Sequence, residues 1–314
     1  MSDISHTAIL GAGVIGSSWA ALFLAAGRSV TIYDPSPDAE TQARTAIDAA
    51  WPALEELGLT ARGTPDSLRF VPSATEAVDG AEFVQENAPE RALIKHALYG
   101  EIEPKLTPNA IVSSSTSGMT LEALQMGWEN PKQLVLGHPF NPPHLIPLVE
   151  LTANDRTGEG VLDQTEAFYQ DIGKVTIRIK KGMPGHVANR LQAAVWREAV
   201  HMAVEGVASV EDIDTAMWAG PGLRWAAMGP TMLFNLGAGE GGLRAFCDHF
   251  RDTFNGWWDD LGQPYLTEEV IETLVSGVNA QARGQTQRGL AAERDALIIA
   301  MQKSLRDLRS SSSP

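Results

Sequence analysis

The chain has 314 residues, of which 44% are hydrophobic and 20% are charged, and its formal net charge is −15. This length fits two domains of ordinary size, and the composition is typical of a soluble globular protein. The acidic balance disfavours nucleic-acid binding through a basic surface, and an anionic ligand would need a local basic group. No apolar run is long enough to span a membrane and the N-terminus has no basic region, so we expect a cytoplasmic protein. The single cysteine, Cys247, predicts neither an internal disulfide nor a metal cluster.

A dinucleotide-binding pattern opens the chain. A short apolar strand at residues 7–10 is followed by the turn GAGVIG, a buried helix and a second strand, VTIYD. In such a turn the first glycine allows a tight bend, the second lets the backbone approach a pyrophosphate, and the third lets the helix pack closely on the strand. The helix N-terminus then offers unpaired N–H groups to the phosphates. The residues expected at the cofactor are Gly11, Gly13, Val14, Ile15 and Gly16.

Asp34, the last residue of the second strand, indicates which cofactor is bound. A carboxylate at this position accepts hydrogen bonds from ribose hydroxyls and repels a 2′-phosphate. The next residues, Pro35, Ser36 and Pro37, supply no arginine to compensate. We therefore expect NAD rather than NADP. The alternative is that Asp34 only caps the following turn, where aspartate is common.

Strands and helices continue to alternate up to residue 180. Strand patterns cover 68–71, 81–86, 110–115, 133–137 and 175–180, and helical patterns cover 89–106 and 120–127. This alternation predicts an α/β fold with a Rossmann-type, doubly wound, mostly parallel sheet. Ligands bind such sheets at the carboxyl ends of the strands, so Ser117 and His138, which follow strands, are expected near the nicotinamide.

The stretch GHPFNPPHLIPLVEL, residues 137–151, contains the best candidate for a general base. His138 and Glu150 are its only strongly proton-active side chains, and the proline-rich turn between them lets the chain fold back so that they can meet. A carboxylate beside an imidazole raises its basicity and fixes its tautomer. The alternative is an ordinary surface pair. The hydroxyl-rich stretch 113–118 is read mainly as a turn and helix cap, with one hydroxyl available to donate to a substrate oxygen.

The second half of the chain is predicted to be entirely helical. A long helix is expected over 182–206, a second over 209–220 with Ser209 and Asp212 as its capping pair, and others near 229–237, 239–255, 267–281 and 284–308. Gly182, Pro184 and Gly185 mark the boundary, which gives domains of residues 1–184 and 185–314. The apolar helices are expected to pack on the first domain, on a second subunit, or on both.

Arg224, in the stretch GPGLRWAAMGP, is a candidate for the local basic group. An arginine binds a carboxylate or phosphate in bidentate fashion, and Trp225 lies beside it in the sequence. The alternative, equally weighted on sequence alone, is that Arg224 pairs with Asp214 or Glu240 to hold the loop.

Five stretches of the chain together resemble the L-3-hydroxyacyl-CoA dehydrogenase superfamily in their order and spacing, and the resemblance covers nearly the whole chain. They are GAGVIG, PERALIK, SSSTSG, HPFNPPHLIPLVE and ANRL. The resemblance implies an NAD-binding domain followed by a helical domain that forms a homodimer. It implies that His138 and Glu150 are the catalytic pair, and that Ser117 and Asn189 assist at the substrate oxygen. It extends the cofactor contacts beyond the glycine turn to Asp34, Glu90, Lys95, Ser117 and Asn141.

Within the superfamily, the loop around Arg224 resembles the branch that contains lambda-crystallin, an L-gulonate 3-dehydrogenase, and L-carnitine dehydrogenase. The implied activity is NAD-dependent oxidation of a small free L-3-hydroxy acid, with Ser117, Asn189, Arg224 and Trp225 at the substrate. Carnitine's trimethylammonium would need aromatic or acidic neighbours, for which Trp196, Trp218, Trp225 and Phe234 are candidates. Two alternatives stay open: a dehydrogenase of CoA thioesters, and a non-catalytic crystallin-like or NAD-sensing protein.

Overall fold

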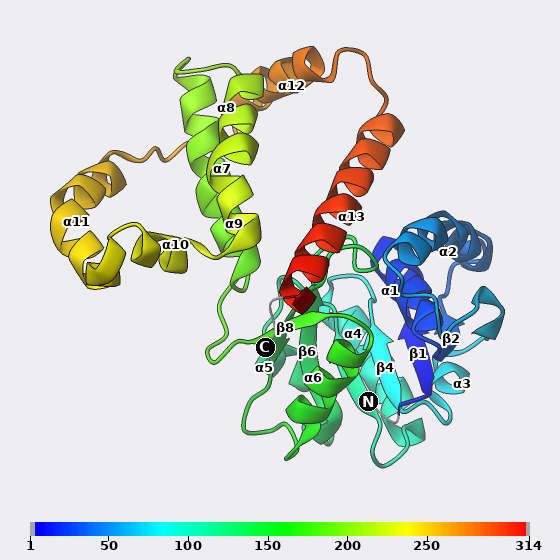
Figure 1. Cartoon of the computed structure of the whole chain (residues 1–314). Coiled ribbons are helices and arrows are strands. Elements are labelled where there is room, and N and C mark those ends of the chain that lie inside the picture. The colour runs from blue at the N-terminus through cyan, green and yellow to red at the C-terminus, as the bar shows by residue number, and fades with distance from the viewer. Residues whose placement is uncertain (1–3, 312–314) are drawn as a thin grey trace. The chain divides into compact units, whose positions relative to one another are not determined.

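The computed structural model describes residues 4–311 and divides into two compact units (Figure 1). Unit 1 comprises the residues up to Ala188 together with Asp295–Lys303, and unit 2 comprises Asn189–Arg294 together with the residues from Ser304 onward. Helix α13, at Gln287–Ser311, therefore contributes to both units. The boundary of independent domains between residues 184 and 185 stays a prediction.

Unit 1 is built on an eight-stranded sheet of order β3-β2-β1-β4-β5-β6-β7-β8. Its strands are β1 (His6–Leu10), β2 (Ser29–Tyr33), β3 (Leu68–Phe70), β4 (Phe83–Glu86), β5 (Ile111–Ser114), β6 (Leu134–Pro139), β7 (Leu148–Thr152) and β8 (Val175–Arg178). Strands β1 to β6 pair in parallel, β7 pairs antiparallel with β6, and β8 pairs in parallel with β7. The predicted Rossmann-type sheet is confirmed, and β7 is a strand that the sequence patterns did not identify as one.

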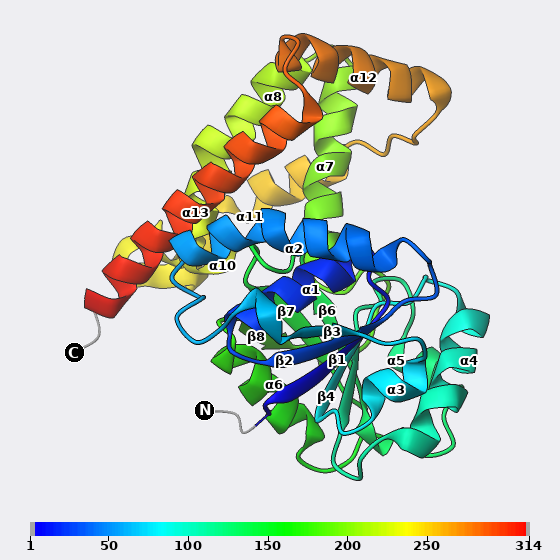
Figure 2. The same cartoon turned by 90° about the vertical axis from the view of Figure 1, so that its right-hand side faces the viewer.

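Helices cover both faces of this sheet, so that the central strands β4 and β5 are buried along their whole length. Along β1, Ile9 packs into one core with α1 (Val14–Ala25), α2 (Ala39–Glu56) and α6 (Val161–Asp171). Its neighbours Ala8 and Leu10 point to the other core, with α3 (Ala74–Val78), α4 (Ala92–Ile102) and α5 (Leu121–Gln125). Figure 2 shows α1 and α2 side by side over the sheet. Short 3-10 helices lie at Pro65–Ser67, Glu103–Lys105 and Pro131–Gln133.

Unit 2 contains helices joined by turns and loops, and its described residues include no strand. Its elements are α7 (Ala188–Val204, whose first residue belongs to unit 1), α8 (Val210–Met217), a π-helical turn (Trp218–Gly222), α9 (Leu223–Ala227), α10 (Pro230–Leu236), a 3-10 turn (Gly239–Gly241), α11 (Gly242–Asp260), α12 (Glu268–Ala282) and parts of α13. Ser209 caps α8 as predicted, because its Oγ accepts a hydrogen bond from the N–H of Asp212 at 3.1 Å. An all-helical second half is confirmed.

The long helix predicted from residue 182 is wrong at its start. Gly185 and His186 have φ angles of +76° and +51°, in the left-handed region, so an α-helix cannot run through them. Helix α7 begins only at Ala188. The periodicity of its apolar residues did not reveal this, because a turn that precedes a helix need not interrupt the hydrophobic pattern.

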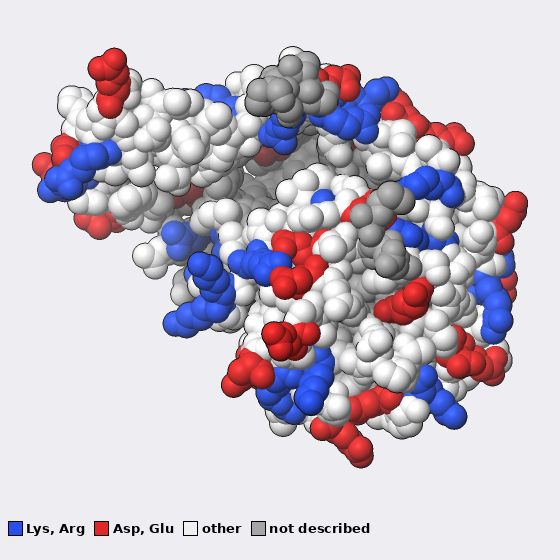
Figure 3. All heavy atoms as spheres, turned by 60° about the horizontal axis from the view of Figure 1, so that its bottom comes forward, with Lys and Arg blue, Asp and Glu red and all other residues white. Residues whose placement is uncertain are grey.

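Two surface properties bear on the expected class of protein. Among residues 4–311, no helix is both long enough and apolar enough to cross a membrane. On the face in view in Figure 3, Lys and Arg side chains are interspersed with Asp and Glu instead of forming one basic patch.

Candidate active site

His138 and Glu150 lie directly opposite one another on the antiparallel strands β6 and β7. His138 Nδ1 is 2.9 Å from Glu150 Oε2, and both side chains are buried, with exposed fractions of 7% and 0%. Directly opposed residues of an antiparallel pair face the same side of the sheet at close range. The predicted meeting of the two residues is therefore found, and the strand register brings them together.

The second oxygen of Glu150 holds the start of helix α7. Oε1 accepts hydrogen bonds from the N–H groups of Val187 and Ala188, each at 2.9 Å. Burial acts to raise the pKa of Glu150, but the hydrogen bonds from His138, Ala188 and Val187 outweigh it and hold that pKa below its usual value. Glu150 is thus a buried carboxylate that connects an imidazole with the first N–H groups of a helix.

The glycine turn between β1 and α1 fits a bound pyrophosphate. Gly11 has a φ of +92°, and a Cβ there would lie 2.7 Å from the carbonyl oxygen of Asn87. A Cβ on Gly16 would lie 1.8 Å from the carbonyl oxygen of Gly11, so that position must also be glycine. A Cβ on Gly13 would meet no atom within 4 Å, which leaves open space where a ligand approaches the backbone. These are the three glycine roles that dinucleotide binding requires.

Asp34 makes two hydrogen bonds at the end of β2. Its Oδ2 accepts from the N–H of Ala12 at 2.7 Å, inside the glycine turn, and its Oδ1 accepts from the N–H of Ser36 at 2.9 Å. The second bond is the turn-capping role weighed as an alternative on sequence. Asp34 therefore holds two turns at the cofactor edge of the sheet, and its contact with a ribose stays a prediction.

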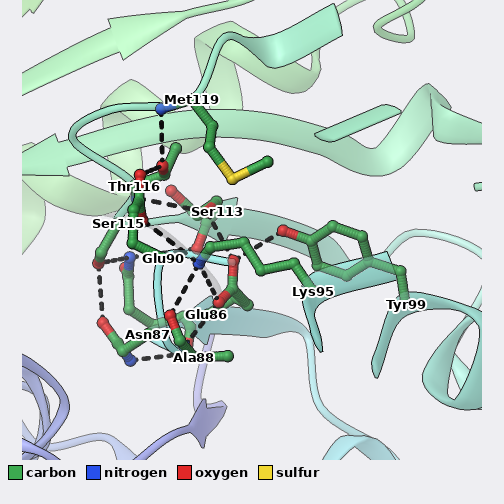
Figure 4. A network of polar contacts seen from close by, with 12 residues as sticks. Glu86, Asn87, Ala88, Glu90, Lys95, Tyr99, Ser113, Ser115, Thr116 and Met119 are labelled. Atoms are coloured by element: carbon green, nitrogen blue, oxygen red, sulfur yellow. Dashed lines mark hydrogen bonds and ion pairs between the residues drawn. The ribbon is translucent and has the colours of Figure 1, made fainter. Parts of the chain in front are cut away.

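Lys95 is buried in a polar network around Glu86, at the end of β4 (Figure 4). Its Nζ donates to Glu86 Oε1 at 2.7 Å and to the carbonyl oxygen of Ala88 at 2.9 Å. Glu86 also accepts from Tyr99 Oη at 2.7 Å and from Ser114 Oγ at 2.6 Å. Burial, followed by the charge of Glu86, raises the pKa of Tyr99 well above its ordinary value. Lys95 therefore links the end of β4 to the loop that follows it.

Glu90 holds the turn that carries Ser117 (Figure 4). Glu90 Oε1 accepts hydrogen bonds from Thr116 Oγ1 and from the N–H of Gly118, the latter at 2.8 Å. Ser117 itself is exposed between these two anchored residues. Thr120, just after the hydroxyl-rich stretch, caps α5, because its side chain accepts a hydrogen bond from the N–H of Ala123. Ser117 is thus the hydroxyl presented outward, while its neighbours hold the turn.

The loop between β6 and β7 contains Asn141 and is held by hydrogen bonds from the buried side chain of Lys174. Asn141 is exposed. Lys174 is buried and donates to the carbonyl oxygens of Pro143 and Ile146, with the second bond at 2.7 Å. Its ammonium also lies 4.9 Å from the centre of the Trp19 ring. This anchor was not identified from sequence, because nothing in the sequence shows that a lysine before β8 points inward.

His186 is a further residue beside the His138–Glu150 pair that the sequence did not single out. Its ring centre lies 4.8 Å from that of His138, and its side chain is buried. Burial, and then the charge of His138, lower the pKa of His186. The signal that could have found it is the GMPGH stretch, where a histidine follows a turn residue at the predicted domain boundary.

The remaining predicted substrate residues belong to unit 2. Asn189 follows Ala188 directly and is the first residue of that unit, in the first turn of α7. Arg224 is exposed on the short helix α9, with Trp225 half-buried beside it. Among residues 4–311 the Arg224 guanidinium has no ion pair, and Asp214 instead accepts from Gln281 Nε2 at 3.1 Å. The pairing with Asp214 or Glu240 that was weighed as an alternative is not found in the described residues.

The sheet, the glycine turn and the helical second unit together define a two-part dinucleotide-binding enzyme. Residues 6–182 match the family model described as 3-hydroxyacyl-CoA dehydrogenase, NAD binding domain. Residues 185–284 match the model of the C-terminal domain of the same family. The chain belongs to the 3-hydroxyacyl-CoA dehydrogenase family and is an NAD-dependent dehydrogenase.

Similar proteins and a similar solved structure indicate the branch of the family to which the chain is related. The chain is 43% identical to an L-carnitine dehydrogenase of Nocardiopsis dassonvillei, over 97% of this chain and 93% of that protein. It is 38% identical to an L-carnitine dehydrogenase of Pseudomonas putida, over 99% and 97%. It is also similar to a structure of the NAD⁺-dependent 5-formyl-3-hydroxy-2-methylpyridine 4-carboxylic acid 5-dehydrogenase, with 30% identity, a TM-score of 0.82 and coverage of 96% and 99%.

Proposed function

We propose that this enzyme oxidises the 3-hydroxyl of a small free L-3-hydroxy carboxylic acid to the 3-keto acid, with L-carnitine as the first candidate substrate. The observation that carries the proposal is the buried His138–Glu150 pair at the carboxyl edge of the parallel strands that also carry the glycine turn. Relatives at 38% and 43% identity named for L-carnitine support that substrate over L-gulonate.

In the proposed reaction His138 is the general base. Its Nδ1 is bonded to Glu150, so Nε2 is the nitrogen that takes the proton from the substrate hydroxyl. Bound NAD would supply the acceptor for the hydride that leaves C3. Glu150 orients the ring and stabilises the imidazolium that forms, as a carboxylate does in a Ser-His-Asp triad. The C–H bond at C3 and the O–H bond of the alcohol are thereby broken, and the C–O single bond becomes a carbonyl double bond.

Ser117 and Asn189 are proposed to hydrogen-bond the substrate oxygen as its charge changes. Ser117 is supported by its exposed place in a turn that Glu90 anchors on both sides. Asn189 is supported by its position next to Ala188, whose N–H is bound by Glu150. Preorganised donors of this kind stabilise developing charge without having to reorganise.

Arg224 and Trp225 are proposed to select the substrate. An exposed guanidinium without an ion pair in the described residues suits a free carboxylate, which a thioester lacks. Aromatic faces such as that of Trp225 attract quaternary ammonium groups. A free carboxylic acid is also named in the structural relative at 30% identity.

NAD is proposed to contact the residues that border the carboxyl edge of the sheet. Asp34 would accept from the ribose, and Glu90 and Lys95 would shape the loop against which the nicotinamide side lies. The remaining contacts are those of the glycine turn, Ser117 and Asn141. Dimer formation through the helical unit is part of the proposal, supported by large apolar side chains that are exposed on the chain alone, among them Trp218, Trp257 and Trp258.

The test is a spectrophotometric screen of NADH formation with L-carnitine, L-gulonate, 3-hydroxybutyrate and other free hydroxy acids. We expect turnover with a free acid, and L-carnitine to be the best substrate. Greater activity in the reverse direction on acetoacetyl-CoA would favour the thioester alternative.

His138→Gln is expected to abolish turnover and to leave NADH binding near normal. Loss of NADH binding in that variant would overturn the assignment of His138, and no turnover with any substrate would favour the non-catalytic alternative.

A further inference from the structure

His186 is held in an unusual conformation at the edge of the proposed catalytic pair. Its φ of +51° lies in the left-handed region, which residues other than glycine seldom occupy unless their surroundings fix them. The residue is only 5% exposed, and its ring is tilted by 43° against the ring of His138 at a centroid distance of 4.8 Å. The two residues that follow, Val187 and Ala188, donate to Glu150.

The same ring reaches the turn that presents Ser117. His186 Nε2 lies 3.4 Å from the carbonyl oxygen of Thr116, the residue before Ser117. A carbonyl oxygen only accepts, so Nε2 carries the proton in this contact. At 3.4 Å the contact is at the long end for an N–H···O hydrogen bond. Glu90 holds the turn from its other side, through Thr116 Oγ1 and the N–H of Gly118.

We propose that His186 is a positioning residue that fixes the His138 ring and the Ser117 turn relative to one another, so that one substrate oxygen can meet both. Its ring packs on the base, its Nε2–H binds the turn, and its backbone continues into the N–H groups that bind Glu150. The inference rests on the proposed function, because it assigns His138 and Ser117 to the same reacting oxygen.

His186 performs this role in its neutral form. The charged groups that act on it are His138, Glu150 and Glu90, and burial is the largest influence on its pKa, which lies below the ordinary value. A positive charge on His186 would oppose the imidazolium that forms on His138 during oxidation, because two like charges at this distance repel strongly in a buried site. Its Nδ1 has no hydrogen-bond partner in residues 4–311 and needs none to bind Thr116.

A double-mutant cycle tests whether His186 acts through Ser117. His186→Phe keeps an aromatic ring against His138 but removes the N–H that binds Thr116. His186→Asn removes the ring but suits the left-handed backbone, which asparagine tolerates. We expect each variant to lower kcat about tenfold when Ser117 is present. In a Ser117→Ala background we expect the same changes to lower kcat less than about twofold, because the positioned group is gone.

Equal losses in both backgrounds would overturn the proposal, since a merely structural role would affect both alike. Thermal unfolding of each variant shows whether it folds, and His186→Phe decides the cycle if His186→Asn does not fold.

A second arm needs no turnover. In protein labelled with ¹⁵N-histidine, His138→Asn is expected to raise the pKa of His186, because it removes the charge next to it. An unchanged titration would show that the two rings do not face each other in solution and would overturn the inference. By contrast, a wild-type enzyme that oxidises no hydroxy acid would overturn the proposed function itself, and this outcome is distinct from equal losses in the cycle or an unchanged titration in an active enzyme.

Discussion

His138 Nδ1 lies 2.9 Å from Glu150 Oε2, across a directly opposed pair of residues on β6 and β7. The same carboxylate accepts the N–H groups of Val187 and Ala188, where α7 begins. The proposed base, its orienting acid and the start of the helix that carries Asn189 are therefore linked through one buried side chain. A change at Glu150 should act on all three.

Glu150→Gln is expected to lower kcat on the order of 10³-fold, because an amide cannot both orient the His138 tautomer and stabilise its imidazolium. NADH binding should change little. Steady-state kinetics and a fluorescence titration of NADH measure the two effects. Glu166→Gln, which disturbs an ion pair with Arg178 at the surface, is the matched control and should keep full activity. Comparable kcat values for Glu150→Gln and the wild type would contradict the orienting role.

The same variant should also change how stability depends on pH. The folded-state pKa of Glu150 is lowered, so its contribution is fully present above the unfolded carboxyl pKa of about 4.3 and is lost as pH falls through the folded value. The free energy of unfolding of the wild type should exceed that of Glu150→Gln by about 1–3 kcal/mol near pH 7. This difference should shrink below about pH 4. Urea unfolding at several pH values checks this, and a difference that does not vary with pH would contradict it.

Asp34→Asn is expected to weaken NAD binding about 10- to 100-fold, because a charged acceptor is replaced by a neutral one. Binding of NADP should weaken less or improve, because the repulsion of its 2′-phosphate is removed. Equilibrium titrations with both cofactors measure the change in preference. Asp38→Asn, at an exposed position before α2, controls for the loss of a nearby charge. An unchanged ratio of the two affinities would leave Asp34 with only its role in the two turns.

Arg224→Met is expected to raise KM for a free hydroxy acid about 10- to 100-fold, the loss of a charge-assisted pair, with little effect on cofactor affinity. Arg244→Met, which removes an exposed arginine paired with Asp248 on α11, is the matched control. Initial rates over a range of substrate concentrations give KM for each variant. If KM stays at the wild-type value, Arg224 does not bind the substrate.

Lys174 should make the free energy of unfolding depend on pH in the alkaline range. Burial lowers its pKa to about 7, whereas an unfolded lysine keeps its proton up to about pH 10.4. Between these values the unfolded chain binds more protons than the folded one, so the free energy of unfolding should rise with pH. Lys174→Met should remove this rise, although it also loses the bonds to Pro143 and Ile146. Parallel stability curves for the two proteins between about pH 7 and 10 would contradict the prediction.

Much of unit 1 could be predicted from local sequence, because its signals are local. The glycine turn requires a left-handed Gly11 and a close approach at Gly16, and both requirements appear directly as residue identity. Strands β4, β5 and β6 are buried along their whole length and each begins with a short apolar run, whereas β7 was not identified from its sequence pattern. Asp34 was predicted as the last residue of the second strand and directly follows β2, which ends at Tyr33, but its hydrogen bond to Ala12 depends on the tertiary arrangement.

The residues around the His138–Glu150 pair were less predictable, because their roles depend on contacts between distant segments. Lys174 binds carbonyl groups of the loop before β7, and Glu90 binds residues on either side of Ser117. In neither case does the number of residues between the partners in the sequence indicate that they are in contact. The start of α7 was misplaced for the same reason, since the apolar period does not show that Gly185 and His186 adopt left-handed conformations.

The sequence by itself determined the class of fold, the family, and that a histidine and a glutamate separated by a proline-rich turn could meet. Only the tertiary structure decided how they meet. The antiparallel register of β6 and β7 sets His138 opposite Glu150, and the fold brings Val187, Ala188 and the His186 ring to them. The physical reason is that a residue's identity fixes which hydrogen bonds it can make, whereas strand register and packing between distant segments fix which partners it finds.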